Sequence, residues 1–321
     1  MKSSIQSQIQ NMEIQADFGY ALATFEQPPN KSDYIQSFTA DYIRRHALFS
    51  NVNRYTNIIW NFMRFCPPSE VTFEGLDAVC MFTSLSFFID DQSDHDDLAY
   101  LERYQTLING LRLPETLSEQ ALFELLQHAK KLSQLHKISS DPFRQHLLNY
   151  VAAQRWERNL LNMGQACFTV EDYQRYRPDA IALLPYLALL KLAENIDDSQ
   201  FNPLQRSRLL FMEQLATRIA YLDNDLYSWR SEQNEPTALN LVKVFKENLA
   251  LSWEESFQRV YAFRNATVER YLQNREEALN EDNTVELRRY IELIECAITG
   301  NFEAMKQLKL HKLRYELSLS F

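Results

Sequence analysis

Glycine is rare in this chain: only five of its 321 residues are glycine, where an average sequence would contain roughly 7 %. Glycine supplies the positive φ angles of tight β-hairpins and of the loops that wrap closely around phosphate groups. So few glycines argue against a β-sandwich, a β-barrel or a doubly wound nucleotide-binding sheet. The glycines also lie too far apart for a G-x-G-x-x-G motif, and none begins a G-K-[ST] sequence. If the protein binds a phosphate group, it does so without a glycine-rich loop.

The charge balance narrows the class of ligand. The chain has 33 Lys and Arg against 43 Asp and Glu, which gives a net charge of −10. This is the wrong sign for a general binder of nucleic acid or of an anionic membrane surface. We therefore expect no nucleic-acid partner, and any anionic ligand has to meet a local group of basic side chains.

The cysteines and the N-terminal sequence both indicate a reducing environment. The four cysteines are widely spaced and form no C-x-x-C pair: Cys66, Cys80, Cys167 and Cys296. This spacing argues against a disulfide framework and against a zinc knuckle. No apolar run reaches the roughly 18 residues of a membrane span, and the N-terminal residues are polar where a signal peptide would be apolar. We expect a cytoplasmic protein without stable membrane insertion.

Proline residues divide the chain into helical segments. Residues 1–30 are polar and end in Pro28-Pro29, so they are predicted to form a flexible N-terminal arm. In residues 31–321 apolar residues recur with a helical period, and no stretch shows a sustained period of two. Short breaks interrupt this pattern at Pro67-Pro68, Pro114, Pro142, Pro178, Pro203 and Pro236. The sequence thus predicts one all-α domain, a single-domain helical bundle.

One predicted helix, residues 203–232, has an unusual polar face. Its start is marked by Asn202-Pro203, a capping side chain followed by a proline that fits the first helical turn. Apolar residues form one stripe along the helix: Phe211, Leu215, Ile219, Leu222, Leu226 and Trp229. The opposite face carries Tyr221 and then Asn224, Ser228 and Glu232 at positions i, i+4 and i+8. A surface helix would have lysines and glutamates there, so we interpret this row of oxygen atoms as part of a binding site.

A second group of oxygen ligands ends the predicted helix over residues 79–97. Asp90, Asp94 and Asp97 lie on one face of this helix, and Asp91 is turned about 100° away. Like charges this close, near the negative end of the helix dipole, are destabilising unless a cation binds them. Oxygen-only ligands suit Mg²⁺, which is usually shared with the phosphate groups of a substrate. The alternative interpretation is an acidic helix end that is exposed to water.

Together the two elements resemble those of class I terpene synthases. That family binds metal ions through a D-D-x-x-D element and an [ND]-D-x-x-S-x-x-x-E element, and this chain has both, followed by Asn240-Leu241-Val242 as in the microbial branch. Trp156-Glu157 ahead of Arg177 is a further similarity. The resemblance implies a helical bundle with a central, metal-lined cavity. It also implies that Mg²⁺, three ions in this family and replaceable by Mn²⁺, is bound by Asp90, Asp94, Asn224, Ser228 and Glu232, with Asp91 and Asp225 as supporting residues.

The resemblance assigns the diphosphate of the substrate to basic residues. The diphosphate-sensing arginine of the family corresponds to Arg177, with Arg175 as the alternative. The closing arginine-tyrosine pair near the C-terminus corresponds to Arg314 and Tyr315. Microbial members commonly place a basic residue just before the last glutamate of the second element. This chain has a serine there, so Arg230 is the candidate for that contact.

The walls of the implied cavity can be assigned in the same way. Downstream of its sensing arginine the family breaks a helix at small residues that end in glycine, and here Ala180 or Ile181 are the nearest counterparts. Phe87 and Thr83 lie one and two turns before Asp90, so the spacing predicts that both line the cavity. The remaining candidates for the cavity wall are Phe62, Phe65 and Tyr221.

The resemblance implies a terpene synthase that uses Mg²⁺ to ionise an acyclic isoprenyl diphosphate and cyclises the resulting carbocation, with release of diphosphate. Farnesyl diphosphate, and hence a sesquiterpene product, is the first expectation, and geranyl and geranylgeranyl diphosphate are the alternatives. A prenyl-chain-elongating transferase would carry an arginine pair where this chain has Ala99-Tyr100. A non-catalytic helical scaffold would have lost metal-binding positions. The expected partner is the small-molecule substrate, and the expected assembly is a monomer or a homodimer.

Overall fold

The computed structural model describes residue 22 and residues 25–93, 98–162, 168–234 and 239–310. Within these residues every regular element is a helix, which confirms the all-α class expected from the sequence. The N-terminal half forms α2 (Pro29–His46), α3 (Val52–Met63), α4 (Phe73–Ser93), α5 (Ala99–Ile108), α6 (Leu117–His136) and α7 (Asp141–Asn162). The C-terminal half forms α8 (Val170–Ala180), α9 (Leu183–Ala193), the 3-10 turn η1 (Asp198–Gln200), α10 (Pro203–Glu232), α11 (Leu241–Asn248), α12 (Trp253–Glu281) and α13 (Val285–Leu310).

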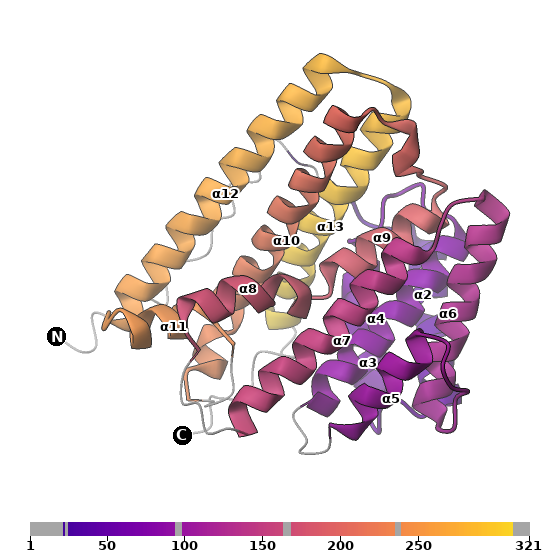
Figure 1. Cartoon of the computed structure of the whole chain (residues 1–321), viewed down its shortest axis with the longest axis horizontal. Helices are drawn as coiled ribbons and strands as arrows, with labels where there is room; N and C mark the ends of the chain where they lie inside the picture. The colour runs from indigo at the N-terminus through magenta and orange to yellow at the C-terminus, as the bar shows by residue number, and fades with distance from the viewer. Residues whose placement is uncertain (1–21, 23–24, 94–97, 163–167, 235–238, 311–321) are drawn as a thin grey trace.

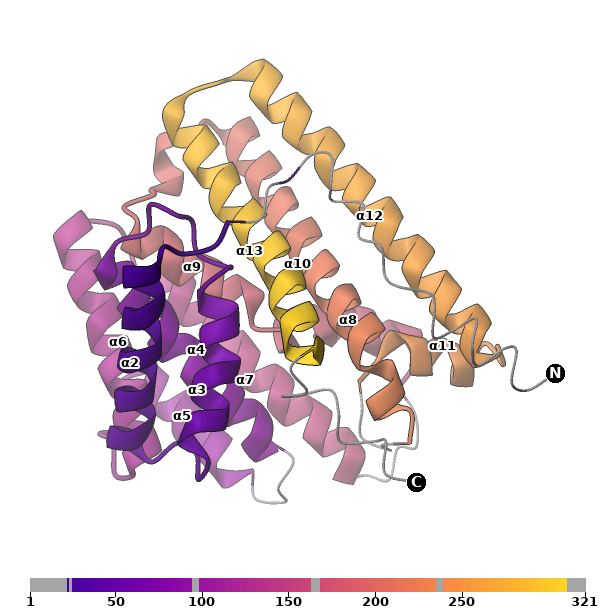
Figure 2. The same cartoon turned by 180° about the vertical axis from the view of Figure 1, so that it is seen from behind.

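Two groups of helices make up the bundle. Helices α10, α12 and α13 run side by side on one side of the molecule, and α2, α3, α4 and α6 gather on the other (Figures 1 and 2). Helix α10 packs against α12 and α13, whereas α4 packs against α2, α6 and α9. Helix α13 also packs against α3 and α9, so it joins the two groups. The largest hydrophobic core runs through both groups.

Helix α10 covers the residues that the sequence predicted for it, Pro203–Glu232. The side chain of Asn202 accepts hydrogen bonds from two backbone N–H groups of the first turn, and proline occupies that turn without loss of a needed donor. The predicted apolar stripe is largely buried, at Leu215, Ile219, Leu222 and Leu226. Another side of the helix is buried as well, because Asp223 accepts a hydrogen bond of 2.7 Å from Nε of Arg264 on α12. Helix α10 is therefore held from several sides, and this fixes which side chains face inward.

The described end of the predicted N-terminal arm is docked on the connection between α3 and α4. The backbone N–H of Gln27 donates to the carbonyl oxygen of Arg64 at 2.8 Å. Its side-chain Nε2 donates to the carbonyl oxygens of Pro67 at 3.0 Å and Pro68 at 2.8 Å. Helix α2 begins at Pro29, slightly before the predicted start of the domain at residue 31. Most of the arm lies outside the described residues.

The helix break near Arg177 follows Pro178 rather than coinciding with it, and α8 ends at Ala180 with Ile181 as its C-cap. Pro178 is inside α8, in its last turn, because the fixed φ of proline is compatible with a helix. The N–H of Ile181 still donates to the carbonyl oxygen of Arg177 at 3.2 Å. The break follows at Ala182, which has a φ of +62° and precedes the first residue of α9. An alanine thus adopts the left-handed conformation that glycine usually provides.

Gly300 brings α13 directly against the chain that follows α3, at Phe65 and Cys66. A Cβ atom added to Gly300 would lie 2.4 Å from the carbonyl oxygen of Phe65 and 2.5 Å from the Cα of Cys66. The contact is therefore between two backbones, and any side chain at this position would push α13 away.

The cysteines and the helix lengths of the described residues bear on the environment of the protein. Cys66, Cys80 and Cys296 are free and buried, and Cys167 lies outside the described residues. Within the described part of the chain, no helix combines the length and the apolar composition that a membrane crossing would need.

Candidate active site

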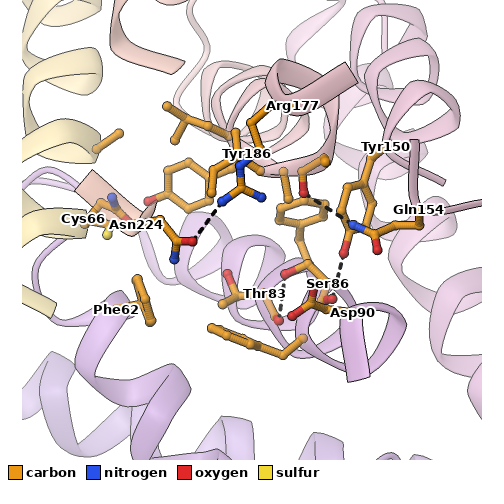
Figure 3. A pocket seen from close by; sticks show the side chains of 18 of the residues that line it. Phe62, Cys66, Thr83, Ser86, Asp90, Tyr150, Gln154, Arg177, Tyr186 and Asn224 are labelled. Atoms are coloured by element: carbon orange, nitrogen blue, oxygen red, sulfur yellow. Dashed lines mark hydrogen bonds between the residues drawn. The ribbon is translucent and has the colours of Figure 1, made fainter. Parts of the chain in front are cut away.

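The helices surround a cavity of about 350 Å³ between α3, α4, α7, α10, α13 and the α8–α9 break. Figure 3 shows side chains from these elements around it. One part of its wall is apolar and includes Phe62, Met63, Phe82, Phe87 and Leu183. Another part carries charged and amide groups: Asp90, Asp91, Glu157, Arg177, Asn224 and Glu232. Both oxygen-bearing elements that stand out in the sequence therefore reach the same cavity.

Helix α4 provides a mixed wall. Thr83, Phe87 and Asp90 all line the cavity, in agreement with their spacing along one helical face. The ring of Phe87 lies against that of Phe62 from α3, with 5.5 Å between the ring centroids. An aromatic surface thus begins one turn away from the carboxylate of Asp90.

Asp91, the second aspartate of the D-D-x-x-D element, is held in place by a tyrosine. Asp91 accepts a hydrogen bond from the hydroxyl of Tyr55 on α3. The ring of Phe49 stacks on the ring of Tyr55, with 3.6 Å between the centroids and nearly parallel planes. The packing of Tyr55 therefore orients Asp91, and nothing in the local sequence around Tyr55 indicates this role.

On α10, two of the predicted metal ligands, Ser228 and Glu232, accept hydrogen bonds from the same asparagine, Asn240. Asn224 and Glu232 line the cavity, whereas Ser228 between them is buried. Nδ2 of Asn240 donates to Oγ of Ser228 at 3.2 Å, to Oε2 of Glu232 at 2.9 Å and to the carbonyl oxygen of Asp225 at 2.9 Å. Burial raises the pKa of the Glu232 carboxyl, and the hydrogen bond from Asn240 opposes that rise. Asn240, the residue after which α11 begins, thus orients the last turn of α10.

Arg177 reaches the same group of side chains from α8. Its Nη2 donates to Oδ1 of Asn224 at 2.9 Å and to Oδ1 of Asp225 at 2.7 Å (Figure 3 shows the first). Asp225 is fully buried and also accepts from the hydroxyl of Tyr173 at 2.5 Å and from the N–H of Leu241 at 2.7 Å. Burial is the largest single influence and favours the neutral guanidine, but the nearby acidic groups, Asp225 foremost, together outweigh it and raise the pKa of Arg177 above its ordinary value. Arg177 is therefore a permanent cation at the cavity wall.

The α8–α9 break itself forms part of the wall. Ala180, Ile181 and Ala182 all line the cavity, so both counterparts considered from the sequence are present. Nε2 of Gln154 on α7 donates to the carbonyl oxygen of Ala180 at 3.4 Å (Figure 3). The break is thus in contact with the cavity and is connected to α7.

Besides the buried Ser228 and Asp225, three further predicted site residues of the described ranges do not line the cavity. Phe65 is buried in the protein interior. Tyr221 is buried with its ring edge-on to Tyr173 at 5.7 Å, and Arg230 is exposed with its guanidinium 5.3 Å from the ring centroid of Trp229. Sequence spacing gives the angle between two residues on one helix but not the rotation of that helix toward the cavity. This is why Tyr221 and Arg230 turn away although neighbours on α10 face inward.

Of the two arginines considered for the diphosphate-sensing position, the structure brings one to the cavity. Arg175 is exposed, and its guanidinium lies 5.1 Å from the ring centroid of Tyr176, whereas Arg177 lines the cavity. Asp94, Arg314 and Tyr315 lie outside the described residues.

Several polar residues of the cavity are absent from the sequence-based set. Tyr150, Gln154 and Glu157 line it from α7 at positions i, i+4 and i+7, a spacing that could have indicated an inward face. The hydroxyl of Tyr150 donates to the carbonyl oxygen of Ser86 on α4 at 2.8 Å. The remaining ones are Ser86, Tyr186 and Asn301. Single polar residues in apolar surroundings, such as Tyr186, give no signal in a sequence.

The donor atoms at the polar part of the cavity fit a hard divalent cation. The carboxylates of Asp90 and Glu232 and the amide of Asn224 supply oxygen atoms, which Mg²⁺ prefers. No group of three or more His, Cys, Asp or Glu within the described ranges could hold a metal ion alone. Helix α10 contributes an amide and a hydroxyl beside one carboxylate. Oδ1 of Asn224 accepts from Arg177, so a metal ion on that atom requires Arg177 to turn toward another acceptor.

Residues 81–270 match the family model described as terpene synthase family 2, C-terminal metal binding. The chain belongs to this terpene synthase family. The matched region begins inside α4 and ends inside α12, so it contains Asp90, Asp91 and the whole of α10. The expectation drawn from the two oxygen-bearing elements is thereby confirmed at the level of the family.

Two curated relatives are identical to this chain at about a quarter of the aligned positions. Delta(6)-protoilludene synthase 8 of Postia placenta is 26 % identical over 209 residues, which are 62 % of this chain and 59 % of that protein. Delta(6)-protoilludene synthase 18 of the same fungus is also 26 % identical over 209 residues. The chain thus aligns with about three fifths of the length of these relatives.

Solved structures of terpene synthases share the fold. Germacradien-4-ol synthase from Streptomyces citricolor superposes with a TM-score of 0.75 at 17 % identity, covering 92 % of this chain and 100 % of that one. For 2-methylisoborneol synthase from Streptomyces coelicolor A3(2) the TM-score is 0.74 at 16 % identity, with 92 % and 95 % covered. These similarities confirm the expected helical-bundle fold of class I terpene synthases.

Proposed function

We propose that this protein converts farnesyl diphosphate into a cyclic sesquiterpene and releases diphosphate. The observation that carries the proposal is one cavity with two kinds of wall: oxygen donors with Arg177 on one part, and aromatic and aliphatic side chains on the other. An isoprenyl diphosphate has the same division, because a dianionic or trianionic head is joined to a hydrocarbon chain.

The polar part of the cavity is proposed to bind the diphosphate together with metal ions. Asp90, Asn224, Ser228 and Glu232, with Asp94, are the proposed ligands of Mg²⁺, three ions by the family resemblance, for which Mn²⁺ can substitute. When bound, Mg²⁺ supplies a Lewis acid that makes diphosphate a better leaving group. Asp91 and Asp225 support this group of ligands.

Arg177 is proposed to bind the diphosphate oxygens directly. It already lies at the cavity wall, and its guanidinium is a permanent cation that the nearby Asp225 favours further. When an anion binds, Arg177 can keep its 2.7 Å contact with the buried Asp225 and redirect the hydrogen bond that it now gives to Asn224. Arg314 and Tyr315 are proposed to make further contacts with the same anion when the cavity closes.

The apolar part of the cavity is proposed to hold the hydrocarbon chain and the carbocation. Water would quench an allylic cation, so a wall of Phe62, Phe82 and Phe87 serves to exclude it. Each aromatic face that the cation approaches can stabilise it by about 0.5–2 kcal/mol. Phe87 is next to Asp90 on the inward face of α4, so it is proposed to meet the charge first.

The size of the cavity bears on the length of the substrate. A volume of about 350 Å³ is near the lower end of the roughly 300–1,000 Å³ of small-molecule pockets. This favours farnesyl diphosphate over the longer geranylgeranyl diphosphate. Geranyl diphosphate is the second candidate, because a shorter chain also fits.

The experiment is incubation of the purified protein with Mg²⁺ and each of the three diphosphates, followed by mass spectrometry of the volatile products. We expect a cyclic C15 product from farnesyl diphosphate and release of inorganic diphosphate. Asp90→Asn and Asn224→Ala should abolish this activity, while Asp197→Asn, in an aspartate pair outside the cavity, is the matched control and should leave it unchanged.

Two results would contradict the proposal. Longer prenyl diphosphates formed in the presence of isopentenyl diphosphate would indicate a chain-elongating transferase instead. Absence of any product from all three substrates, with a helical circular dichroism spectrum, would indicate a non-catalytic scaffold.

A further inference from the structure

Tyr186 places a hydroxyl group without a hydrogen-bond partner in the cavity wall. Its side chain is 5 % exposed, and its ring and hydroxyl belong to α9, the helix that follows the break. Within the described part of the chain, no donor or acceptor lies within hydrogen-bond distance of this hydroxyl. A buried polar group that is left unpaired is destabilising. The missing partner is therefore expected to be something that enters the cavity.

The surroundings of the Tyr186 hydroxyl belong to the apolar part of the cavity. Burial is the main influence on the pKa of its phenol, followed by the nearby thiols of Cys66, Cys296 and Cys80, and no described carboxylate of the polar part is among the causes. In Figure 3 Tyr186 lies on the side of the cavity that also carries Cys66, away from Tyr150 and Gln154. Burial raises the pKa of the phenol well above its ordinary value, so the group stays neutral and can both donate and accept.

A second unpaired donor faces the same cavity from another helix. Nδ2 of Asn301 on α13 is buried and has no partner in the described ranges, and Asn301 lines the cavity. Asn301 lies one turn before Met305, whose sulfur is 4.0 Å from Nδ2 of Asn224. One turn further back, Ala297 lines the cavity beside the buried Cys296. The amide of Asn301 thus lines the cavity from α13, one turn away from the residue of that helix that contacts Asn224.

A hydrocarbon chain cannot satisfy either group, because it has no hydrogen-bonding atoms. A water molecule can, since it offers two donors and two acceptors and is stable in a buried site that has polar partners. We propose that Tyr186, with Asn301, holds a water molecule in the apolar part of the cavity and directs it to the last carbocation, so that a terpene alcohol is formed. This inference rests on the proposed function and adds the class of product to it.

The step balances without any further reagent. A lone pair on the water oxygen forms a C–O bond to the cationic carbon, which gives a protonated alcohol. One O–H bond of that group then breaks, its electron pair stays on oxygen, and the proton passes to the diphosphate that ionisation has released. The hydroxyl of Tyr186 is not consumed, and its role is to fix the position of the water oxygen.

The test compares Tyr186→Phe with the natural protein in buffer made from H₂¹⁸O. Phenylalanine keeps the ring and removes only the hydroxyl. With Mg²⁺ and farnesyl diphosphate we expect the natural protein to give an alcohol that carries ¹⁸O. In Tyr186→Phe the ratio of alcohol to hydrocarbon should fall by about fivefold or more, which is the effect of one lost hydrogen bond. Tyr271→Phe is the matched control, because Tyr271 has an equally buried hydroxyl without a described partner but does not line the cavity.

The outcomes separate this inference from the proposed function. Exclusively hydrocarbon products from the natural protein, or an unchanged alcohol fraction in Tyr186→Phe, would overturn the role of Tyr186 while leaving the terpene synthase activity intact. Asn301→Leu should also lower the alcohol fraction, and an unchanged fraction there would remove Asn301 from the inference. Release of no diphosphate by the natural protein would refute the proposed function instead.

A second measurement does not depend on turnover. A high-resolution crystal structure of the natural protein should contain an ordered water about 2.6–3.0 Å from Oη of Tyr186. The same site should be empty in crystals of Tyr186→Phe. A dry site in the natural protein would overturn the proposal even if the enzyme proved inactive on all the substrates tried.

Discussion

Nη2 of Arg177 donates a hydrogen bond of 2.9 Å to Oδ1 of Asn224, the same oxygen that Asn224 would offer to a metal ion. The two residues come from α8 and α10, and the guanidinium is also paired with the buried carboxylate of Asp225 at 2.7 Å. A cation therefore already lies against this oxygen. Binding of the metal ion and reorientation of Arg177 toward an anion are expected to be coupled for this reason.

Arg177→Lys tests the directional role of the guanidinium. Lysine keeps the positive charge beside Asp225 but cannot donate in two directions from a planar group. We expect kcat/KM for farnesyl diphosphate to fall by about 100-fold, because charge-assisted hydrogen bonds to the diphosphate are lost. The measurement is release of inorganic diphosphate. The control is Arg175→Lys, which alters an exposed arginine two residues away and should change the rate by less than about twofold. Equal losses in the two variants would contradict the assignment of Arg177.

Asn240→Ala tests the residue that orients Ser228 and Glu232. Loss of the hydrogen bonds from Nδ2 frees both side chains to rotate, and partners of this kind typically change metal affinity by about 10–100-fold. We expect the Mn²⁺ concentration at half-saturation, measured by electron paramagnetic resonance without substrate, to rise by about tenfold or more. Asn274→Ala on α12 removes an asparagine that bonds only within its own helix in the described contacts, and it serves as the control. Unchanged Mn²⁺ binding in Asn240→Ala would show that Asn240 does not orient the ligands.

Ala182→Gly tests the left-handed residue of the α8–α9 break. At a φ of +62° an alanine is strained by roughly 1–2 kcal/mol, and glycine is not. Glycine also gains entropy in the unfolded chain, which offsets about 0.4–1 kcal/mol of the benefit. We therefore expect the free energy of unfolding in urea to stay equal or rise by about 1 kcal/mol. Ala188→Gly, inside α9, should lower it by about 1 kcal/mol instead. A lower free energy of unfolding in both variants would show that Ala182 is not strained.

Glu295 is expected to make stability depend on pH. Burial raises the pKa of its carboxyl to about 7 from 4.5, although Arg275 at 2.5 Å opposes the rise. The folded protein therefore binds this proton more tightly than the unfolded chain does. The contribution is fully present below pH 4.5 and is lost as the pH rises through 7, with a total of up to about 3 kcal/mol.

The measurement for Glu295 is urea unfolding of the natural protein and of Glu295→Gln at several pH values between 5 and 8. Other buried carboxyls add to the slope of the natural protein, so the difference between the two proteins isolates Glu295. We expect the natural protein to lose stability relative to Glu295→Gln as the pH rises. Parallel curves would refute the raised pKa.

The extent to which sequence determined the fold can be seen on α10 and α8. The limits of α10 were predictable because Asn202 and Pro203 mark its start through local chemistry, and because its apolar stripe follows one period for many turns. The resemblance to a family places the break after α8 at Ala180 or Ile181, and α8 ends at Ala180, but nothing in an alanine announces the positive φ of Ala182. Local sequence signals determine the limits of α10, whereas tertiary packing determines the conformation at the break after α8.

The residues of the candidate site also fall into those that the sequence could assign and those that only tertiary packing determines. Asp90, Phe87 and Asn224 could be assigned to the cavity from helical spacing and from the resemblance to a family. Tyr221 was assigned on equal grounds and points elsewhere, because only packing sets the rotation of a helix. Tyr55 could not have been found, since its contact with Asp91 joins two helices that the sequence does not pair.

The backbone contact at Gly300 has a practical meaning for redesign of the product spectrum. With a Cβ at this position only 2.4 Å from a carbonyl oxygen, libraries that vary Gly300 would mostly yield misfolded variants. Ala297 and Asn301 flank it on the same helix and both face the cavity. Their Cα atoms are held at fixed distances from α3 by the glycine contact, so a change of side chain there alters cavity volume without moving the helix. Directed evolution of this enzyme should therefore keep Gly300 constant and randomise these two positions.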